Sequence, residues 1–345
     1  MIISKNFSFR GILSFTGHHF IWLIPYPAII VAVYHYFGLY WLTIPWFPLS
    51  IVGTAVAFYV GFKNNSAYDR MWEARKIWGG IINTSRSWGM YVKSFITNQF
   101  AENPVGDHEL DGLRKRLIYR HIGWLYAHRS QLLTPTPWEH VSLGGQVGKY
   151  ARKRQKKFGV GMVDDEVSKT ELHRYLPKEE YEHLIGYANT ATQIIDHQSQ
   201  DLKELREKGL TDDFRHMEMQ KLLSEFYNLQ GKNERIKKFP LPRQYANMSF
   251  IFIALFIVML PFGVVSEFAK LGEWAIWMTI PSVAIIGWVY VTMELVGDYS
   301  ENPFEGMAND IPMLSLCRTI EIDLREMIGD EDIPAPIEAK NKVLM

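Results

Sequence analysis

Four runs of about 20 residues without a charged side chain constrain this 345-residue chain more than any other feature. None of the runs contains Asp, Glu, Lys or Arg, and they cover residues 20–40, 41–62, 245–266 and 274–293. A membrane-spanning helix needs roughly 20 predominantly apolar residues. Four buried core helices of a soluble protein are the alternative, but soluble chains rarely carry four such runs. The sequence predicts an all-α membrane protein with four transmembrane helices and a helical cytosolic domain.

Lysine and arginine are distributed unevenly around these runs. The join near residues 37–41 carries neither, and the join near 267–273 carries only Lys270, whereas basic residues flank the other ends of the runs. Because cytoplasmic loops are enriched in Lys and Arg, both termini and the long middle segment are expected in the cytoplasm. The predicted location is the plasma (inner) membrane, crossed several times.

The order of the runs predicts four regions. Residues 1–65 form an N-terminal region with transmembrane helices 1 and 2, and residues 66–240 form a cytosolic helical domain. Residues 241–295 contain transmembrane helices 3 and 4, and residues 296–345 form a cytosolic C-terminal segment. Apolar periodicity predicts helices in the middle of the chain over residues 66–98, 110–133, 176–208 and 211–233. The Gly-rich, then basic segment 141–170 is interpreted as a surface loop, and the last residues as a loose tail.

The chain carries no recognisable catalytic constellation. It lacks the phosphate-binding, dinucleotide-binding, nucleophile-elbow and zinc-protease motifs, so it is not expected to be an enzyme. Lys plus Arg equals Asp plus Glu at 37 each, which gives no support for a nucleic-acid partner. Its one cysteine, Cys317, excludes an internal disulfide and a paired-cysteine metal site. We expect neither cofactor nor metal.

The second run contains a periodic stripe within GTAVAFYVGF, residues 53–62. Residues four apart lie on nearly one helix face, and the stripe consists of Thr54, Phe58 and Phe62. A neighbouring face of small residues permits close helix approach, and it consists of Gly53, Ala57 and Gly61. Several copies around an axis would turn such a stripe into a narrow apolar pore. In a single copy the stripe would pack on its own subunit, and periodicity alone leaves both possibilities open.

Three blocks of sequence resemble the bestrophin-like membrane proteins, particularly their bacterial branch. They are PLSIVGTAVAFYVGFKNNSAYDRMWEARKIWG, KKFPLPRQYANMSFIFIALFIVMLPFGVV and ENPFEGMANDIPMLSLCRTIEIDLREM, at residues 48–79, 237–265 and 301–327. The blocks occur in the family's order and, with the four runs, extend the resemblance over most of the chain.

The resemblance implies a homopentameric ion channel with a hydrophobic neck on its fivefold axis and a wider cytosolic vestibule. Matched to the family's pattern, the neck falls on Thr54, Phe58 and Phe62. A second constriction, at the cytosolic exit, falls on Phe214, with Asp212 and Asp213 beside it. The calcium-activated animal members have an acidic run after their NPF element, and NPFEGMAND lacks it. The resemblance therefore does not extend to a calcium site.

The sign of the permeating charge is predicted from the pore-lining residues. Aromatic edges carry partial positive charge, so rings of phenylalanine seen edge-on favour anions such as chloride. Acidic residues at the exit would instead attract cations. An anion channel is expected, and a cation-selective channel of the same architecture is the first alternative. A membrane-anchored scaffold or binding protein without conduction is the second.

Overall fold

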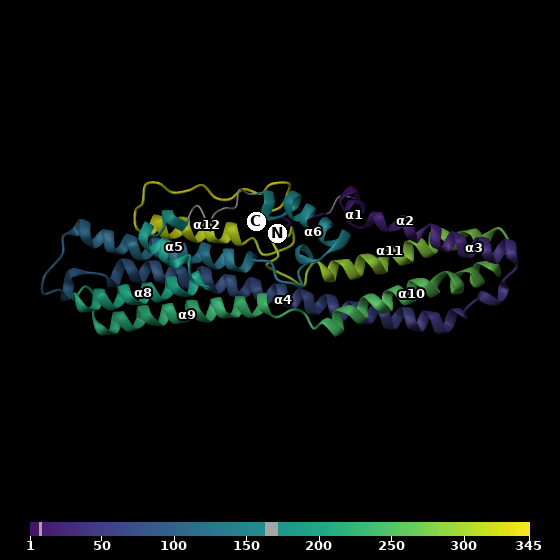
Figure 1. The fold of residues 1–345 in the computed structure, drawn as a ribbon, viewed down its shortest axis with the longest axis horizontal. Helices are drawn as coiled ribbons and strands as arrows, with labels where there is room; N and C mark the ends of the chain where they lie inside the picture. The colour runs from purple at the N-terminus through teal and green to yellow at the C-terminus, as the bar shows by residue number, and fades with distance from the viewer. Residues whose placement is uncertain (7–8, 163–171) are drawn as a thin grey trace. The chain divides into compact units, whose positions relative to one another are not determined.

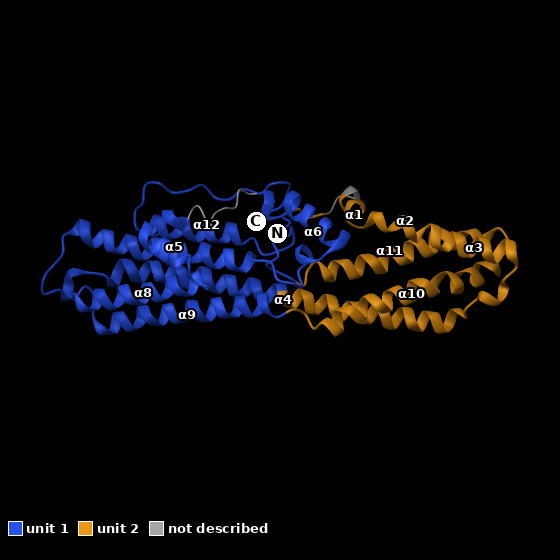
Figure 2. Ribbon diagram, viewed as in Figure 1, with its two compact units in different colours: residues 1–3, 71–239, 302–345 blue, residues 4–70, 240–301 orange. Residues whose placement is uncertain are grey.

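A computed structural model describes residues 1–6, 9–162 and 172–345. The described residues form helices joined by turns and irregular segments, with two isolated bridges, Ile2 with Val343 and Lys340 with Val343. They form two compact units (Figures 1 and 2). We call residues 4–70 and 240–301 the membrane unit, and residues 1–3, 71–239 and 302–345 the helical unit.

The membrane unit contains the helices that the uncharged runs predict. They are α1 (Phe9–Thr16), α2 (Phe20–Leu23), α3 (Pro25–Phe37), the first part of α4 (Trp46–Phe95), α10 (Arg243–Ala269) and α11 (Thr279–Asp298). Four largely helical segments among the described residues are long and apolar enough to cross a bilayer: Gly11–Phe37, Tyr40–Phe95, Arg243–Ala269 and Ala275–Asp298. The prediction of an all-α protein with four transmembrane helices is confirmed.

Close packing of α4 against α10 and α11 forms the interior of the membrane unit. Apolar side chains of α4 contact those of α10, and the buried set includes Leu49, Val56, Val60, Phe256, Ile257 and Leu260. A Cβ at Gly53 would lie 2.8 Å from the Phe256 ring. The Tyr290 hydroxyl donates a hydrogen bond to the Gly53 carbonyl at 3.0 Å. Glycine is therefore required where the rings of α10 and α11 meet α4.

The helical unit surrounds a core rich in aromatic residues. It holds the second part of α4 with α5 (Asp107–Leu133), α6 (Gly145–Phe158), α7 (Lys178–Leu184), α8 (Thr190–Glu207), α9 (Asp213–Lys238) and α12 (Met313–Met327). The fully buried large side chains include Trp78, Trp88, Trp124 and Phe226. The Trp124 indole donates a hydrogen bond to Gln230 Oε1 at 2.9 Å, as buried polar groups usually do. The indole nitrogens of Trp78 and Trp88 have no hydrogen-bond partner among the described residues.

Two histidines of α5 lie within this aromatic core. A ring nitrogen of His121 lies 2.9 Å from Ser85 Oγ, and one of His128 lies 3.1 Å from Asn233 Nδ2. Burial lowers the pKa of His121 to about 3 and that of His128 to about 4, since a charged ring is penalised away from water. Both are neutral core residues at physiological pH.

Two predictions about helices in the helical unit are wrong. The helix expected over 176–208 is interrupted, since α7 ends at Leu184 and α8 begins at Thr190. The Asn189 side chain caps α8 by accepting a hydrogen bond from the Thr192 amide at 3.0 Å. The basic segment interpreted as a loop forms α6 instead. The end of that segment, residues 163–171, lies outside the described residues.

The C-terminal tail is not loose, in contrast to the prediction. Val343 and Met345 are buried. The Met345 carbonyl accepts a hydrogen bond from the Ser315 amide at 2.7 Å, and the Leu344 amide donates to the Met1 carbonyl at 2.9 Å. The last residues are held by the start of α12 and by the N-terminus.

Candidate functional site

The predicted stripe of α4 lines an open groove on the membrane unit. Thr54, Phe58 and Phe62 are all exposed, and the two phenylalanines expose 66% and 64% of their surface. The groove has a volume of about 640 Å³, and its lining comprises Thr54, Ala57, Phe58, Gly61, Phe62, Asn65 and Tyr290. The stripe is therefore not covered by the other helices of its own unit.

Polar groups lie at both ends of this aromatic stretch. The Thr54 hydroxyl donates to the Ser50 carbonyl within its own helix at 2.9 Å, so only its lone pairs remain for water or another group. Beyond Phe62, the Asn65 amide donates to Asp69 Oδ2 at 3.2 Å. The groove thus has two phenylalanines in the middle and hydrogen-bonding side chains on either side.

The small residues of α4 divide into two kinds. Gly53 is buried against Phe256 and Tyr290, whereas no atom lies within 4 Å of the place where a Cβ at Gly61 would stand. Ala57 and Gly61 belong to the lining of the groove. Gly53 serves packing within the unit, and Gly61 leaves a shallow surface that a neighbouring helix can approach closely.

A buried ion pair fixes the rotation of α4 directly after the stripe. The Lys63 ammonium, which is 1% exposed, pairs with the Glu294 carboxylate of α11. The Ser249 hydroxyl of α10 donates to the other carboxylate oxygen at 2.5 Å. The Asn64 side chain donates to the Met293 carbonyl at 2.9 Å. Since consecutive residues of a helix point about 100° apart, holding residues 63 and 64 against α11 keeps Phe62 turned toward the groove.

This ion pair is not among the features predicted from the sequence. Lys63 and Glu294 immediately follow the uncharged runs that end at residues 62 and 293. Opposite charges directly after two predicted spans are the signal that could have revealed them.

The residues predicted at the cytosolic exit lie at the start of α9, in the helical unit. Phe214 exposes 85% of its surface. Asp212 caps the helix, because its Oδ1 accepts hydrogen bonds from the Phe214 and Arg215 amides at 2.9 and 3.1 Å. Loop residues before the cap are fixed too, since the Thr97 amide donates to the Leu210 carbonyl at 2.9 Å.

Each of the two carboxylates predicted at the exit is paired with an arginine. Asp212 lies 3.1 Å from Arg215, and Asp213 lies 2.5 Å from Arg206. The hydrogen bond from Arg206 lowers the pKa of Asp213 below its usual value. Two negative and two positive charges therefore surround Phe214, so the net pull on cations that the acidic residues alone would exert is largely cancelled.

Comparison with known proteins assigns the chain to a family. The family model of bacterial and fungal bestrophin proteins matches residues 18–326. The chain belongs to the bacterial and fungal bestrophin family. A voltage-dependent anion channel-forming protein of Escherichia coli, YneE, is 25% identical to this bestrophin over 290 residues, which cover 84% of this chain and 79% of that protein. A relative from Mesorhizobium japonicum with the same descriptive name is 24% identical over 309 residues, 88% of this chain and 82% of that one.

Solved structures agree with this bestrophin in fold. The crystal structure of a bacterial bestrophin homologue from Klebsiella pneumoniae has a TM-score of 0.72 at 21% identity, covering 91% of this chain and 98% of that one. The chain is thus a membrane protein with the bestrophin fold. Within the residues described, no group of three or more His, Cys, Asp or Glu side chains is placed to hold a metal ion.

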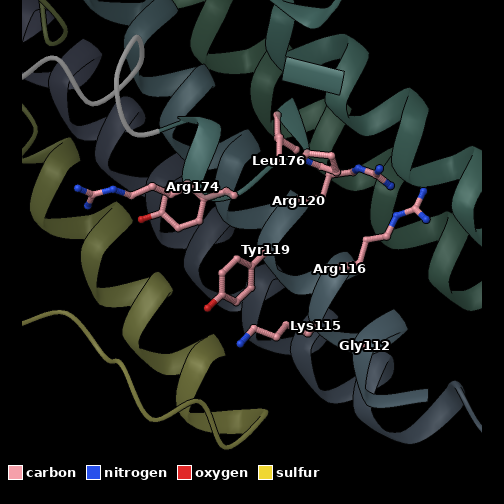
Figure 3. A pocket seen from close by; sticks show the side chains of 9 residues that line it. Gly112, Lys115, Arg116, Tyr119, Arg120, Arg174 and Leu176 are labelled. Carbon is pink, nitrogen blue, oxygen red and sulfur yellow. The ribbon is translucent and has the colours of Figure 1, made fainter. Parts of the chain in front are cut away.

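The helical unit of this bestrophin has a second concavity, a cleft of about 380 Å³ bordered by α5 and residues 174–177 (Figure 3). Several basic side chains line it, but carboxylates compensate them. Lys115 lies 3.1 Å from Asp330, and Arg116 lies 2.5 Å from Asp201. Arg120 lies 2.7 Å from Glu180. These ion pairs tie α5 to its neighbours, and the cleft carries little uncompensated charge.

Proposed function

We propose that this bestrophin is a homopentameric channel that conducts small anions such as chloride. In this proposal five copies of the groove face a common axis, and Thr54, Phe58 and Phe62 form successive rings of the neck. The observation that carries the proposal is the exposure of both phenylalanines along a groove that also contains small and hydrogen-bonding residues. The descriptive names of the relatives, which include anion channel-forming proteins, add support.

The proposed neck would select by charge and by wetting. Phenylalanine edges carry partial positive charge, so two rings of them present a weakly attractive surface to an anion. A narrow apolar constriction also resists filling by water and can therefore gate. The Thr54 ring, whose oxygens can accept hydrogen bonds from water, would keep the outer end of the neck wetter. Phe214 would form the second constriction, beside carboxylates whose charge Arg206 and Arg215 offset.

The proposed topology follows the distribution of basic residues. Regions 1–65 and 241–295 would hold the transmembrane helices, and regions 66–240 and 296–345 would lie in the cytoplasm with both termini. The membrane would be the plasma (inner) membrane. No cofactor is required, since selection and gating would both arise from side chains along the axis.

Electrical recording of the purified protein in planar bilayers tests the proposal. Under a gradient of potassium chloride, we expect the reversal potential to move toward the chloride equilibrium potential. A reversal on the potassium side would overturn anion selectivity in favour of a cation channel of the same architecture. A monomeric mass in detergent together with no current would overturn the channel itself and favour a membrane-anchored scaffold.

A further inference from the structure

Helix α6 has an unusually basic composition. Its sequence, GQVGKYARKRQKKF, contains six Lys or Arg residues and no Asp or Glu. Five of these six side chains are exposed: Lys149, Arg152, Lys153, Lys156 and Lys157. In a chain whose positive and negative residues balance at 37 each, such a local excess is a distinct surface feature.

The five exposed cations lie on one face of α6. Counted from Lys149, the others follow at positions +3, +4, +7 and +8, which is the spacing of a single helix face. Gly148 and Ala151 are buried on the other side. We call the exposed set the basic face of α6.

The lysines of the basic face have no acidic partner in the described part of the chain. Within residues 1–6, 9–162 and 172–345, no carboxylate pairs with Lys149, Lys153, Lys156 or Lys157. Four exposed lysines on other helices of the same unit each have a carboxylate within 4.0 Å, namely Lys178, Lys203, Lys221 and Lys238. Other exposed lysines of the described residues lack one, but they stand singly and not as a cluster on one helix face, for example Lys76, Lys93 and Lys232. The charge of the basic face is therefore available to an external anion.

Hydrogen bonds from the second half of α6 and from the residues just after it hold the helix to its own unit. An Arg152 nitrogen donates to the Val141 carbonyl at 2.6 Å. The Gln155 amide donates to the Glu305 carbonyl at 2.8 Å, and the Val160 amide donates to the Gly306 carbonyl at 3.0 Å. Glu305 follows Asp298, the last residue of α11, by seven residues (305 − 298). The segment that holds α6 therefore follows a transmembrane helix closely along the chain.

We propose that the basic face of α6 binds the anionic phospholipid headgroups of the bilayer that holds the protein. Clusters of four to eight Lys and Arg on an amphipathic helix or next to a membrane span are attracted to anionic lipid. Nucleic acid also carries negative charge. The transmembrane helices, however, anchor the protein in the bilayer, and this raises the effective concentration of lipid headgroups near α6. This inference does not rest on conduction, because the contact would exist whether or not ions pass.

A fluorescent label beside the basic face tests the contact in the full-length protein. The native cysteine, Cys317, is buried, so Gln146→Cys supplies a single exposed thiol, three residues before Lys149 on the same face. The labelled protein is placed in nanodiscs that carry a headgroup-attached quencher. We expect quenching to be stronger in discs with anionic lipid than in purely zwitterionic discs. The difference should vanish in about 1 M salt, where the Debye length is about 3 Å.

Two charge-matched variants make the test specific. The variant Lys149→Gln, Lys153→Gln, Lys156→Gln and Lys157→Gln should lose the dependence on anionic lipid. The variant Lys178→Gln, Lys203→Gln, Lys221→Gln and Lys238→Gln removes the same charge elsewhere and should keep it. Equal quenching in both kinds of disc would overturn the proposal, as would a response that survives the first variant. A label that responds to a single-stranded oligonucleotide and not to anionic lipid would overturn it in favour of nucleic acid.

Discussion

The two parts of α4 each contain a pair of large aromatic residues, and these two pairs differ in their exposure. Residues 46–70, in the membrane unit, leave Phe58 and Phe62 66% and 64% exposed, whereas residues 71–95, in the helical unit, bury Trp78 and Trp88 completely. Exposing apolar surface to water costs about 25 cal/mol per Å², but exposing it to lipid does not, because lipid tails are as apolar as the side chain. The buried Trp78 and Trp88 therefore belong to the core of the helical unit. The exposed Phe58 and Phe62 can be covered either by lipid or by another subunit.

Replacing a buried tryptophan of the second part should have the largest effect. Trp88→Ala removes a fully buried ring that packs against His121 and Phe226. We expect it to lower the free energy of unfolding by about 3–5 kcal/mol, measured as a drop in apparent melting temperature in detergent. Trp72→Ala, at a half-exposed position of the same part of α4, is the control and should cost far less. Equal losses at both positions would contradict the contrast between core and surface along this helix.

Breaking the ion pair beneath the stripe should have the next largest effect. Glu294→Gln leaves the buried Lys63 ammonium without its counter-charge, which we expect to cost about 3 kcal/mol. The double variant Lys63→Met and Glu294→Gln should recover most of that loss, since it removes the uncompensated charge. The measurement is again the apparent melting temperature.

A surface pair in the same unit provides the control for this experiment. Glu267→Gln disrupts the exposed pair with Lys270 and should cost no more than about 1 kcal/mol. A single variant at Glu294 that is as stable as the wild type would show that the pair does not hold α4. A double variant no more stable than the single one would assign the loss to packing instead.

This ion pair illustrates what the sequence could and could not predict about the site. Hydropathy located the spans because apolar length is a local property, and the four-residue spacing located the stripe for the same reason. The partner of Lys63 lies 231 residues away along the chain, so no local pattern connects the two. Both residues are also the first charge after an uncharged run. A charge at that place marks the end of a span and gives no sign of a buried ion pair.

The errors outside the membrane unit have equally specific causes. The glycines and charges of segment 141–170 favour a loop, although the Lys, Arg, Gln and Ala residues that form α6 are good helix formers. The break after Leu184 depends on the Asn189 cap, and the tail is held by contacts with Met1 and Ser315. Contacts between the two termini are non-local, and composition alone does not reveal them.

Acid should destabilise the helical unit through its buried histidines. Burial lowers the pKa of His121 to about 3, so between that pH and about 6.5 the unfolded chain binds a proton that the folded chain does not. The stabilising effect of neutral His121 is thus lost as pH falls below 6.5. We expect the stability of the wild type relative to His121→Phe to fall by about 1.4 kcal/mol per pH unit in this window.

Measuring this difference between two proteins isolates the histidine. Asp310 acts in the opposite direction, since burial raises its pKa to about 7, and its effect cancels when both proteins are compared at each pH. Melting temperatures recorded from pH 7 to pH 4.5 provide the test. A constant difference across that range would mean that His121 is protonated as readily in the folded state as in the unfolded state.

The smallest expected change in stability is also the sharpest test of the exposed stripe. Phe58 and Phe250 each expose 66% of their surface, on α4 and α10 respectively. Both Phe58→Ala and Phe250→Ala should change the free energy of unfolding by only about 0.5 kcal/mol, because neither ring is part of the core. If Phe58 lines the neck, its truncation should widen the constriction and raise single-channel conductance, while truncation of Phe250 should leave conductance unchanged. If the two variants change conductance equally, Phe58 has no special position relative to the permeating ion. Its exposed ring would then be assigned to the lipid-facing surface and not to the neck.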